Sequence, residues 1–362
     1  MFYFQKVDKW LLAAVFILVF IGLIMLYSLG TTRTENLKYF WRQLAWLILG
    51  VFLFFILSLI DFRAFSTHPL FLTASYAAVF LLLVLVLIFG KTISGNRAWF
   101  AIGSFTFQPV EFAKVVLILY LAKYFSEKNI EIWRIRHVVI SAAIVGVMVF
   151  LVLLQPDWGS AIVLLGIWFF MLLASGARTK QILGLIFLFL VFVGFSWQFL
   201  LTNQQKQRVL SVVGSQKDPL GVSYSQNQAL IALGSGGFFG KGLGNGTQTQ
   251  LGFLPAPRTD FIFASIGEEL GFLGISAILT SFGLIFWRLF ILALTGMNNF
   301  VKLFSLGYLS WLFVEIVIHV GMNLGISPVI GIPLPFVSYG GSHLLALFMG
   351  LGIVNSIQIY SK

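Results

Sequence analysis

The chain contains no cysteine, and only 10% of its 362 residues are charged. The lack of cysteine excludes disulfide bonds, thiolate metal sites and cysteine nucleophiles. The shortage of charge stands beside 59% hydrophobic residues, 40 phenylalanines and a mean hydropathy of +0.98. That balance excludes a soluble globular domain and indicates an integral membrane protein.

The hydrophobic segments also lack the polar alternation that the strands of a membrane β-barrel show. They are continuous runs of roughly 17 to 25 residues, the length of a membrane-spanning helix. We therefore predict an all-α, polytopic membrane protein, formed by residues 1–362 as a single transmembrane domain with about ten helices. The expected spans cover, within a few residues, about 10–29, 44–60, 70–90, 110–124, 138–154, 160–175, 182–201, 261–287, 303–323 and 344–359.

Acidic residues are scarce, because 12 Asp and Glu stand against 23 Lys and Arg, a formal net charge of +11. With no soluble domain to bind nucleic acid, anionic lipid or an anionic lipid-linked substrate is the better partner. Lys and Arg are concentrated in the termini and short connections of one face of the predicted bundle. By the positive-inside rule, we expect that face and both termini to be cytoplasmic. The other face carries more cations than topology requires, which an anionic ligand or simple loop solubility would explain: among them Lys38, Arg42, Lys91, Arg97, Lys241 and Arg258.

One connection is far longer than a helix bundle needs. Residues 202–259 are expected to form a large extracytoplasmic loop with short interfacial helices, one of them starting at Tyr224. Its glycine-rich run at 234–246, G-S-G-G-F-F-G-K-G-L-G-N-G, lacks the spacing and the preceding strand of a Walker phosphate loop. The glycines and Lys241 could still approach a phosphate; the alternative is a tight irregular turn.

Ionisable side chains in or beside the predicted spans are few. Placing each of them in or near the membrane costs free energy, so each is expected to have a structural or functional role. Asp260 stands where the proline-rich run P-A-P-R-T-D becomes an apolar helix. It is either the N-cap of that helix or a catalytic carboxylate at the membrane surface. Arg258 either binds a phosphate or ends the loop. Of Glu268 and Glu269, which follow about two turns later, at least one must face the protein interior.

Other ionisable residues also allow two interpretations. Glu111 and Lys114 are three residues apart in one predicted span and can form an ion pair, which is structural or substrate-binding. Asp157, in Q-P-D-W-G-S, is an ordinary helix-starting residue or part of the site. Glu315 and His319 are one helical turn apart, so we expect them to hydrogen-bond to each other.

The segment 323–342, N-L-G-I-S-P-V-I-G-I-P-L-P-F-V-S-Y-G-G-S, has too much Pro and Gly for a helix and is too apolar for a solvated loop. Such backbone is tolerated at membrane depth only where it is buried in protein or lines a cavity. We therefore expect it to face the same cavity as Asp260, with Ser338 and Tyr339 supplying hydroxyl groups.

Several of these runs together resemble the SEDS family of bacterial cell-wall proteins. They are Q-P-V-E-F-A-K, Q-P-D-W-G-S-A, I-A-L-G-S-G-G-F-F-G-K-G-L-G, L-P-A-P-R-T-D-F-I-F-A-S-I-G-E-E-L-G and G-I-P-L-P-F-V-S-Y-G-G-S. Their order and their places among the predicted spans extend the resemblance over essentially the whole chain. Gln155 before Pro156 and the run T-Q-T-Q-L-G-F-L-P are more similar to the elongation branch of the family than to its division branch.

The resemblance implies a peptidoglycan glycosyltransferase that polymerises lipid II on the outer face of the bacterial cytoplasmic (inner) membrane. It also implies a complex with a class B penicillin-binding protein, which supplies the transpeptidase. The essential aspartate of the family matches Asp260, and further family positions match Glu111, Lys114 and Asp157. His343 departs from the family pattern, because a small hydroxyl residue is expected there.

The implied chemistry needs one general base, because a diphosphate leaves without being protonated. Asp260 would accept the proton of the acceptor hydroxyl in an inverting displacement. Lys114, Arg258 and Lys241 would neutralise the charge on the diphosphate. No cofactor is required by this chemistry, although a divalent cation, Mg²⁺ or Mn²⁺, held by Asp260 and Asp157, could supply the same neutralisation.

Two other functions stay open on the residues alone. A flippase or transporter of lipid II would use Glu315, His319, Glu111 and Lys114 as coupling or gating groups. The chain shows no inverted internal repeat, however, and its glycine-rich and charged features gather on the outer face. The second of these alternative functions is that of a scaffold for a cell-wall synthase complex.

Overall fold

The computed structural model describes residues 7–32, 37–62, 69–93, 95–103, 105–128, 134–199, 206, 210, 224–296 and 298–360. Of the predicted extracytoplasmic loop 202–259, residues 202–205, 207–209 and 211–223 therefore lie outside the described residues.

Within the described ranges, ten helices have 17 or more residues each. They are α1 (Lys9–Thr32), α2 (Lys38–Leu59), α4 (Pro69–Phe89), α5 (Pro109–Lys128), α6 (Ile135–Leu154), α7 (Trp158–Ala174), α8 (Thr179–Phe199), α12 (Ile262–Thr295), α13 (Asn299–Asn323) and α14 (Gly341–Tyr360). Seven of them (α1, α2, α4, α6, α12, α13 and α14) have the length and hydropathy of membrane spans, and α7 and part of α8 are shorter apolar helices. The prediction of an all-α polytopic membrane protein is confirmed.

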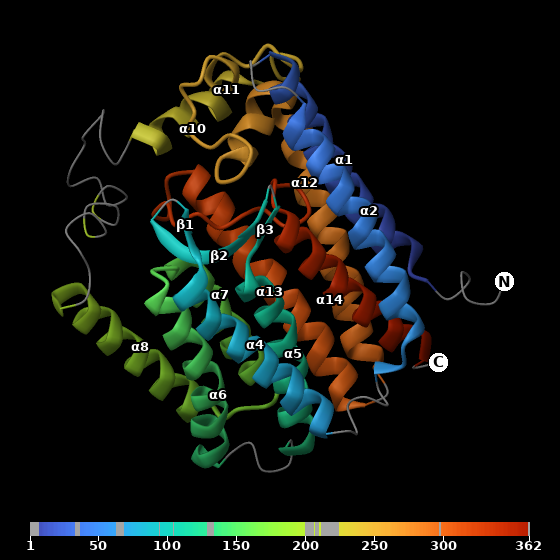
Figure 1. The fold of residues 1–362 in the computed structure, drawn as a ribbon, viewed down its shortest axis with the longest axis vertical. Helices are drawn as coiled ribbons and strands as arrows, with labels where there is room; N and C mark the ends of the chain where they lie inside the picture. Colours follow the sequence, from blue (N-terminus) through green and yellow to red (C-terminus); the bar gives the residue numbers. More distant parts are fainter. Residues whose placement is uncertain are drawn as a thin grey trace.

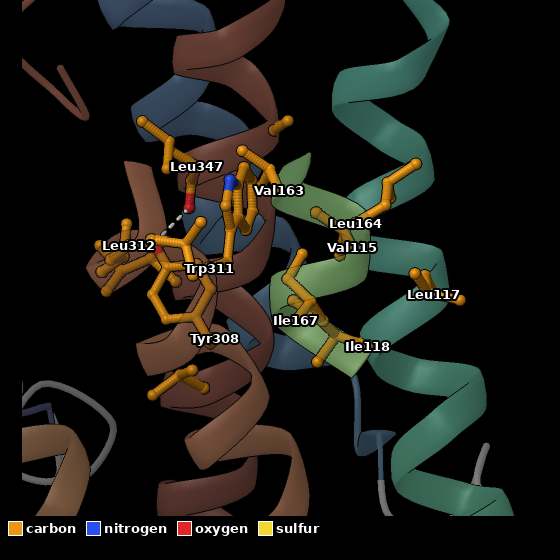
Figure 2. Close-up of a cluster of buried hydrophobic side chains, with 14 of the residues drawn as sticks. Val115, Leu117, Ile118, Val163, Leu164, Ile167, Tyr308, Trp311, Leu312 and Leu347 are labelled. Carbon is orange, nitrogen blue, oxygen red and sulfur yellow. Dashed lines mark hydrogen bonds between the residues drawn. The ribbon is translucent and has the colours of Figure 1, made fainter. Parts of the chain in front are cut away.

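The centre of the bundle is built by α5, α7 and α13, with α14 beside them (Figure 1). Figure 2 shows the apolar side chains that meet there, among them Val115, Leu117, Ile118, Val163, Leu164, Ile167, Tyr308, Trp311, Leu312 and Leu347. The Tyr308 hydroxyl satisfies its hydrogen bond by donating to the carbonyl of Leu347 at 2.9 Å. Outer helices such as α8 instead expose phenylalanine and leucine, as lipid-facing surfaces do.

A small antiparallel sheet, not expected from the sequence, lies between α4 and α5 along the chain. Its strands, in the order β1-β2-β3, are β1 (Lys91–Ile93), β2 (Asn96–Ile102) and β3 (Phe105–Phe107). Phe100 pairs with Phe107 across β2 and β3. Phe107 also stacks on Phe112 in the first turn of α5, with 5.0 Å between ring centroids. The sheet thereby fixes the end of α5 that carries Glu111.

Two short helices, α10 (Tyr224–Ser235) and α11 (Thr247–Gln250), lie at one end of the bundle (Figure 1). The glycine-rich run between them closes on a break in α12, where Gly271 has φ 65°. The amide of Phe272 donates to the carbonyl of Gly237 at 3.0 Å. A Cβ on Gly271 would collide with the backbone of Gly240, so only glycine allows this close approach.

Several backbone N–H groups of the glycine-rich run donate hydrogen bonds inside the protein. The amide of Lys241 donates to the carbonyl of Glu268, and that of Gly242 to the carbonyl of Glu269, at 2.9 and 3.0 Å. The amide of Gly244 donates to the hydroxyl of Ser28 and to the Glu269 carboxylate. The run is therefore a tight irregular turn, in which the amides of Lys241, Gly242 and Gly244 are already paired and are not available to a phosphate.

Candidate active site

Asp260 lies just before α12 without capping it. The helix begins at Ile262, and Phe261 occupies the N-cap position. Before it the backbone makes a turn, in which the amides of Thr259 and Phe261 both donate to the carbonyl of Ala256, at 3.2 and 3.3 Å. The N-cap alternative for Asp260 is therefore wrong, because Phe261 occupies that position and α12 receives no hydrogen bond from the side chain of its N-cap residue.

Asn323, the last residue of α13, caps α12 from outside that helix. Its Oδ1 accepts a hydrogen bond from the amide of Ala264 at 3.1 Å, a group that an N-cap side chain usually satisfies. Its Nδ2 donates to the main-chain carbonyls of Asp260 and His319, at 3.0 and 2.8 Å. The buried amide thus fixes the backbone at Asp260 and leaves its carboxylate available for another partner. No local pattern in the sequence signals this role, because Ala264 and Asn323 are 59 residues apart.

The Asp260 side chain is half-buried beside the segment 324–340. A Cβ on Gly331 would stand 3.7 Å from its Oδ2, so the backbone of that segment runs directly past the carboxylate. Burial raises the pKa of the Asp260 carboxyl, and a hydrogen bond with the Thr259 side chain opposes part of that rise. Among the described residues, this is the only hydrogen bond to the carboxylate. A carboxylate in this state is a stronger base than an exposed aspartate.

Ser338 and Tyr339 hold the segment 324–340 against the loop that carries Asp260. The Ser338 hydroxyl donates to the carbonyl of Thr259 at 2.9 Å and accepts from the amide of Leu334 at 2.8 Å. The amide of Tyr339 donates to the carbonyl of Arg258 at 2.9 Å. The predicted proximity of the two segments is confirmed. Because the Ser338 hydroxyl is buried and already paired, it positions the Asp260 loop.

Lys241 lies at the glycine-rich turn, where its ammonium donates to Glu268 Oε1 and to the Thr247 hydroxyl, both at 2.8 Å. Glu268 also accepts from the amide of Thr249 at 2.8 Å. Glu269 is fully buried as well and accepts a hydrogen bond from Ser28. Both glutamates therefore face the interior and bind the turn to α12. The substrate-binding role of Lys241 stays a prediction.

Glu111 and Lys114 form the predicted ion pair, and two further residues, Glu315 and His343, contact it. The Lys114 ammonium donates to both oxygens of Glu111 at 2.9 Å and to Glu315 Oε1 at 2.7 Å. His343 Nδ1 lies 2.7 Å from Glu111 Oε2, and its Nε2 lies 3.6 Å from Glu315 Oε2. None of the four is more than 5% exposed. This buried quartet joins α5, α13 and α14 and places the Lys114 ammonium between two carboxylates.

The predicted hydrogen bond between Glu315 and His319 is wrong. His319 Nδ1 lies 2.8 Å from the carbonyl of Ile332, and Glu315 is taken by Lys114. One helical turn brings Glu315 and His319 near each other along α13. A buried carboxylate gains more from an ammonium than from a neutral imidazole, so the cation on α5 takes it.

Asp157 starts α7 as its N-cap. Its Oδ1 accepts from the amide of Ser160 at 3.0 Å, and its Oδ2 accepts from the Ser160 hydroxyl at 2.7 Å and from Gln108 Nε2 at 3.2 Å. Burial raises the pKa of the Asp157 carboxyl, while the hydrogen bonds from Ser160 lower it. Both carboxylate oxygens are thus already in use. The link to Gln108 ties α7 to the residue just before α5.

A single group of three carboxylate or imidazole side chains in the described ranges is compact enough to share a metal ion: Glu111, Glu315 and His343. The Lys114 ammonium already bridges its two carboxylates. Asp260 and Asp157, the predicted metal ligands, do not belong to such a group.

The fold and these residues define the class: a polytopic helical membrane protein with a half-buried, basic carboxylate beside an irregular apolar segment and a buried quartet of ionisable side chains. The chain belongs to the FtsW/RodA/SpoVE family, whose family model, described as "Cell cycle protein", matches residues 9–362. The resemblance to the SEDS family is confirmed.

Relatives cover nearly the whole chain. Stage V sporulation protein E of Bacillus subtilis (strain 168) is 36% identical over 365 residues, 98% of each protein. Peptidoglycan glycosyltransferase MrdB of Escherichia coli (strain K12) is 36% identical over 321 residues, 89% of this chain and 86% of that protein.

Two solved structures share the fold. Rod shape determining protein RodA of Thermus thermophilus has a TM-score of 0.73 and 32% identity, covering 98% of this chain and 97% of that chain. A chain from a peptidoglycan synthase complex that coordinates polymerization and crosslinking has a TM-score of 0.81 and 32% identity, covering 97% of each chain.

Proposed function

We propose that this chain is a peptidoglycan glycosyltransferase that polymerises lipid II into glycan strands and releases polyprenyl diphosphate. The observation that carries the proposal is the state of Asp260. Its carboxylate is half-buried, is not used as a helix cap and has a pKa raised by burial. These are the properties of a general base, whose pKa should lie near the pH at which it works.

In the proposed reaction, the 4-hydroxyl of the acceptor sugar attacks the anomeric carbon of the donor from the face opposite the diphosphate. Asp260 takes the hydroxyl proton while the new carbon–oxygen bond forms, and the diphosphate leaves with the electron pair of the broken bond. The configuration at the anomeric carbon inverts. A diphosphate is a good leaving group, so no second carboxylic acid is needed to protonate it.

Among the cations named above, Arg258 lies nearest to Asp260 along the chain and is assigned to the diphosphate. Lys114 is buried in the quartet, so we assign it, with Glu111, to fixing α5 against α13 and α14. A divalent cation, when bound, would supply further neutralisation of the diphosphate. For such an ion Asp260 offers available oxygens, whereas those of Asp157 already accept hydrogen bonds.

We place the protein in the bacterial inner membrane, with both termini in the cytoplasm and Asp260 on the extracytoplasmic side, because of the distribution of cations between its connections. A class B penicillin-binding protein is the proposed partner, supported by the similarity to a chain of a peptidoglycan synthase complex. A role in cell elongation is supported by the similarity to RodA and by the run T-Q-T-Q-L-G-F-L-P.

Purified full-length protein, alone and with its transpeptidase partner, should convert lipid II into glycan chains in a gel-based polymerisation assay. Wild-type protein that never forms chains in either condition would contradict the proposal. The transporter alternative is tested in liposomes: lipid II translocation that is lost in Glu315→Gln or His319→Gln and unchanged in Asp260→Asn would favour it.

A further inference from the structure

The side chain of His319, on α13, is fully buried and is joined to the segment 324–340. Its Nδ1 lies 2.8 Å from the carbonyl oxygen of Ile332. A carbonyl oxygen only accepts hydrogen bonds, so Nδ1 carries a proton and donates it. Within the described residues, Nε2 of the same ring has no hydrogen-bond partner. The imidazole therefore makes its hydrogen bond to the backbone of the segment that passes Asp260.

Gly331, the residue just before Ile332, brings that backbone to the carboxylate. Its φ is 72°, in the left-handed region that glycine favours. A Cβ on Gly331 would stand 3.7 Å from Asp260 Oδ2. The carbonyl that accepts the hydrogen bond of His319 thus belongs to the residue next to the one in contact with Asp260.

The first turn of α7 packs on the same stretch of backbone. A Cβ on Gly159 would lie 2.9 Å from the carbonyl oxygen of Ile330 and 3.1 Å from Cγ1 of Ile332. Such packing limits how closely the segment approaches α7. A hydrogen bond also fixes the direction of a peptide group, because its strength depends on its angle. The bond from His319 therefore supplies the orientation that packing on α7 does not.

The main chain of His319 is joined to the Asp260 loop as well. Its carbonyl accepts a hydrogen bond from Asn323 Nδ2 at 2.8 Å, and the same Nδ2 donates to the main-chain carbonyl of Asp260 at 3.0 Å. One turn of α13 therefore holds the backbone of Asp260 through Asn323. The same turn holds the backbone beside the carboxylate through the imidazole of His319.

The position of this backbone affects the strength of the base. Burial raises the pKa of the Asp260 carboxyl, and the stretch at Gly331 supplies part of that burial. If the stretch moved away, water would reach the carboxylate and its pKa would fall toward the ordinary 3.8. The carboxylate would then be a weaker base and would have more freedom to leave its reactive position.

We propose that His319 is a positioning residue, which holds the backbone of Gly331 and Ile332 against the carboxylate of Asp260. This role rests on the proposed function, in which that carboxylate is the general base. It requires the N–H donor at Nδ1 and not an imidazole that gains and loses protons. The transporter alternative, in which His319 is a coupling or gating group, requires the opposite.

Two substitutions separate the donor from the imidazole. In His319→Asn an amide nitrogen stands as many bonds from Cβ as Nδ1 does, so it can still donate to Ile332. In His319→Leu the space is filled but the donor is lost. Polymerisation by His319→Leu should fall at least about tenfold, because small displacements in an active site are that costly. His319→Asn should stay close to the wild-type rate, and an equal loss in both variants would overturn the proposal.

The pH profile distinguishes positioning from stability alone. The acidic limb of the polymerisation rate should move to lower pH in His319→Leu and should stay at the wild-type position in His319→Asn. The matched control is Tyr308→Phe, which deletes a buried hydrogen bond from the same helix to the carbonyl of Leu347, 2.9 Å long (Figure 2). The control should leave the limb unchanged. An unmoved limb in folded His319→Leu, or an equal shift in Tyr308→Phe, would overturn the proposal.

A second measurement needs no polymerase activity. Hydrogen–deuterium exchange of purified full-length protein in detergent should be faster in peptides of segment 324–340 in His319→Leu and unchanged in His319→Asn. Each variant must elute as a single species. If His319→Leu does not fold, His319→Gln, whose donor is one bond farther from Cβ, should show the same changes to a smaller extent.

The two measurements separate this proposal from the proposed function. Faster exchange in His319→Leu would support the positioning even if the wild type never polymerised lipid II. Wild-type exchange in that variant, with a wild-type rate and an unmoved acidic limb, would refute the positioning and leave the proposed function intact.

Discussion

Removal of the Lys114 ammonium tests how far the buried quartet holds the bundle together. Lys114→Met keeps the length and apolar stem of the side chain but deletes three hydrogen bonds, two to Glu111 and one to Glu315. Both carboxylates are at most 3% exposed, so water cannot replace the lost donor. Of the quartet, only His343 then remains beside them, 2.7 Å from Glu111 and 3.6 Å from Glu315.

The expected loss of stability is large. Breaking a buried ion pair by removing one partner costs about 3–5 kcal/mol, because the remaining charge stays buried and uncompensated. An exposed pair, by contrast, contributes about 0.3–0.5 kcal/mol on a helix surface. Lys123 and Glu127, at 2.8 Å on the same helix and with Glu127 54% exposed, form such a pair. Lys123→Met is therefore the matched control.

Unfolding in detergent, followed by the loss of helical circular dichroism, compares the two variants with the wild type. Lys114→Met should lose several kcal/mol and Lys123→Met less than about 1 kcal/mol. Adding Glu315→Gln to Lys114→Met should recover part of the loss, because one uncompensated carboxylate disappears. A Lys114→Met protein within about 1 kcal/mol of the wild type would refute the reasoning that the quartet is a buried, mutually compensating unit.

Three further predictions concern the Asp260 loop and its supports. Burial raises the pKa of Asp260, so folding favours the protonated form of its carboxyl group. The ionised form therefore destabilises the folded protein at neutral pH. Because Asp260→Asn removes that ionised group, the variant should unfold at the wild-type temperature or above it. For the same reason the polymerisation rate should rise with pH through a pKa above the ordinary 3.8, and an acidic limb at or below that value would contradict this. Asn323→Ala should cost about 1–3 kcal/mol and reduce polymerisation, since it leaves buried groups at Ala264 and Asp260 unpaired. Asn298→Ala, which removes the cap of α13 at Val301, should cost about 1 kcal/mol without a comparable loss of activity.

The features of the fold that could be predicted from the sequence are those that local sequence patterns determine. Continuous apolar runs placed the helices, and the three-residue spacing of Glu111 and Lys114 predicted their ion pair correctly. The proximity of segment 324–340 to Asp260 followed from a physical exclusion, since such backbone is tolerated only where protein buries it.

The features that could not be predicted depend on contacts between distant residues. The cap from Asn323 to Ala264 spans 59 positions, and the bond from Lys114 to Glu315 spans 201. The one-turn spacing of Glu315 and His319 along a single helix predicted a hydrogen bond between them. The position of Asp260 just before a helix predicted that its side chain is the N-cap of that helix. In both cases a side chain from another helix met the same hydrogen-bonding need and changed the partner.

The central claim is that the Asp260 carboxylate removes the proton from the acceptor hydroxyl. The direct measurement is the initial rate of lipid II polymerisation by purified Asp260→Asn beside the wild type, with partner binding and unfolding temperature recorded for both. A general base contributes roughly 10²–10⁴-fold to a rate, so the variant should lose at least about a hundredfold while it stays folded and bound to its partner. A folded Asp260→Asn protein that polymerises lipid II at the wild-type rate would contradict the account.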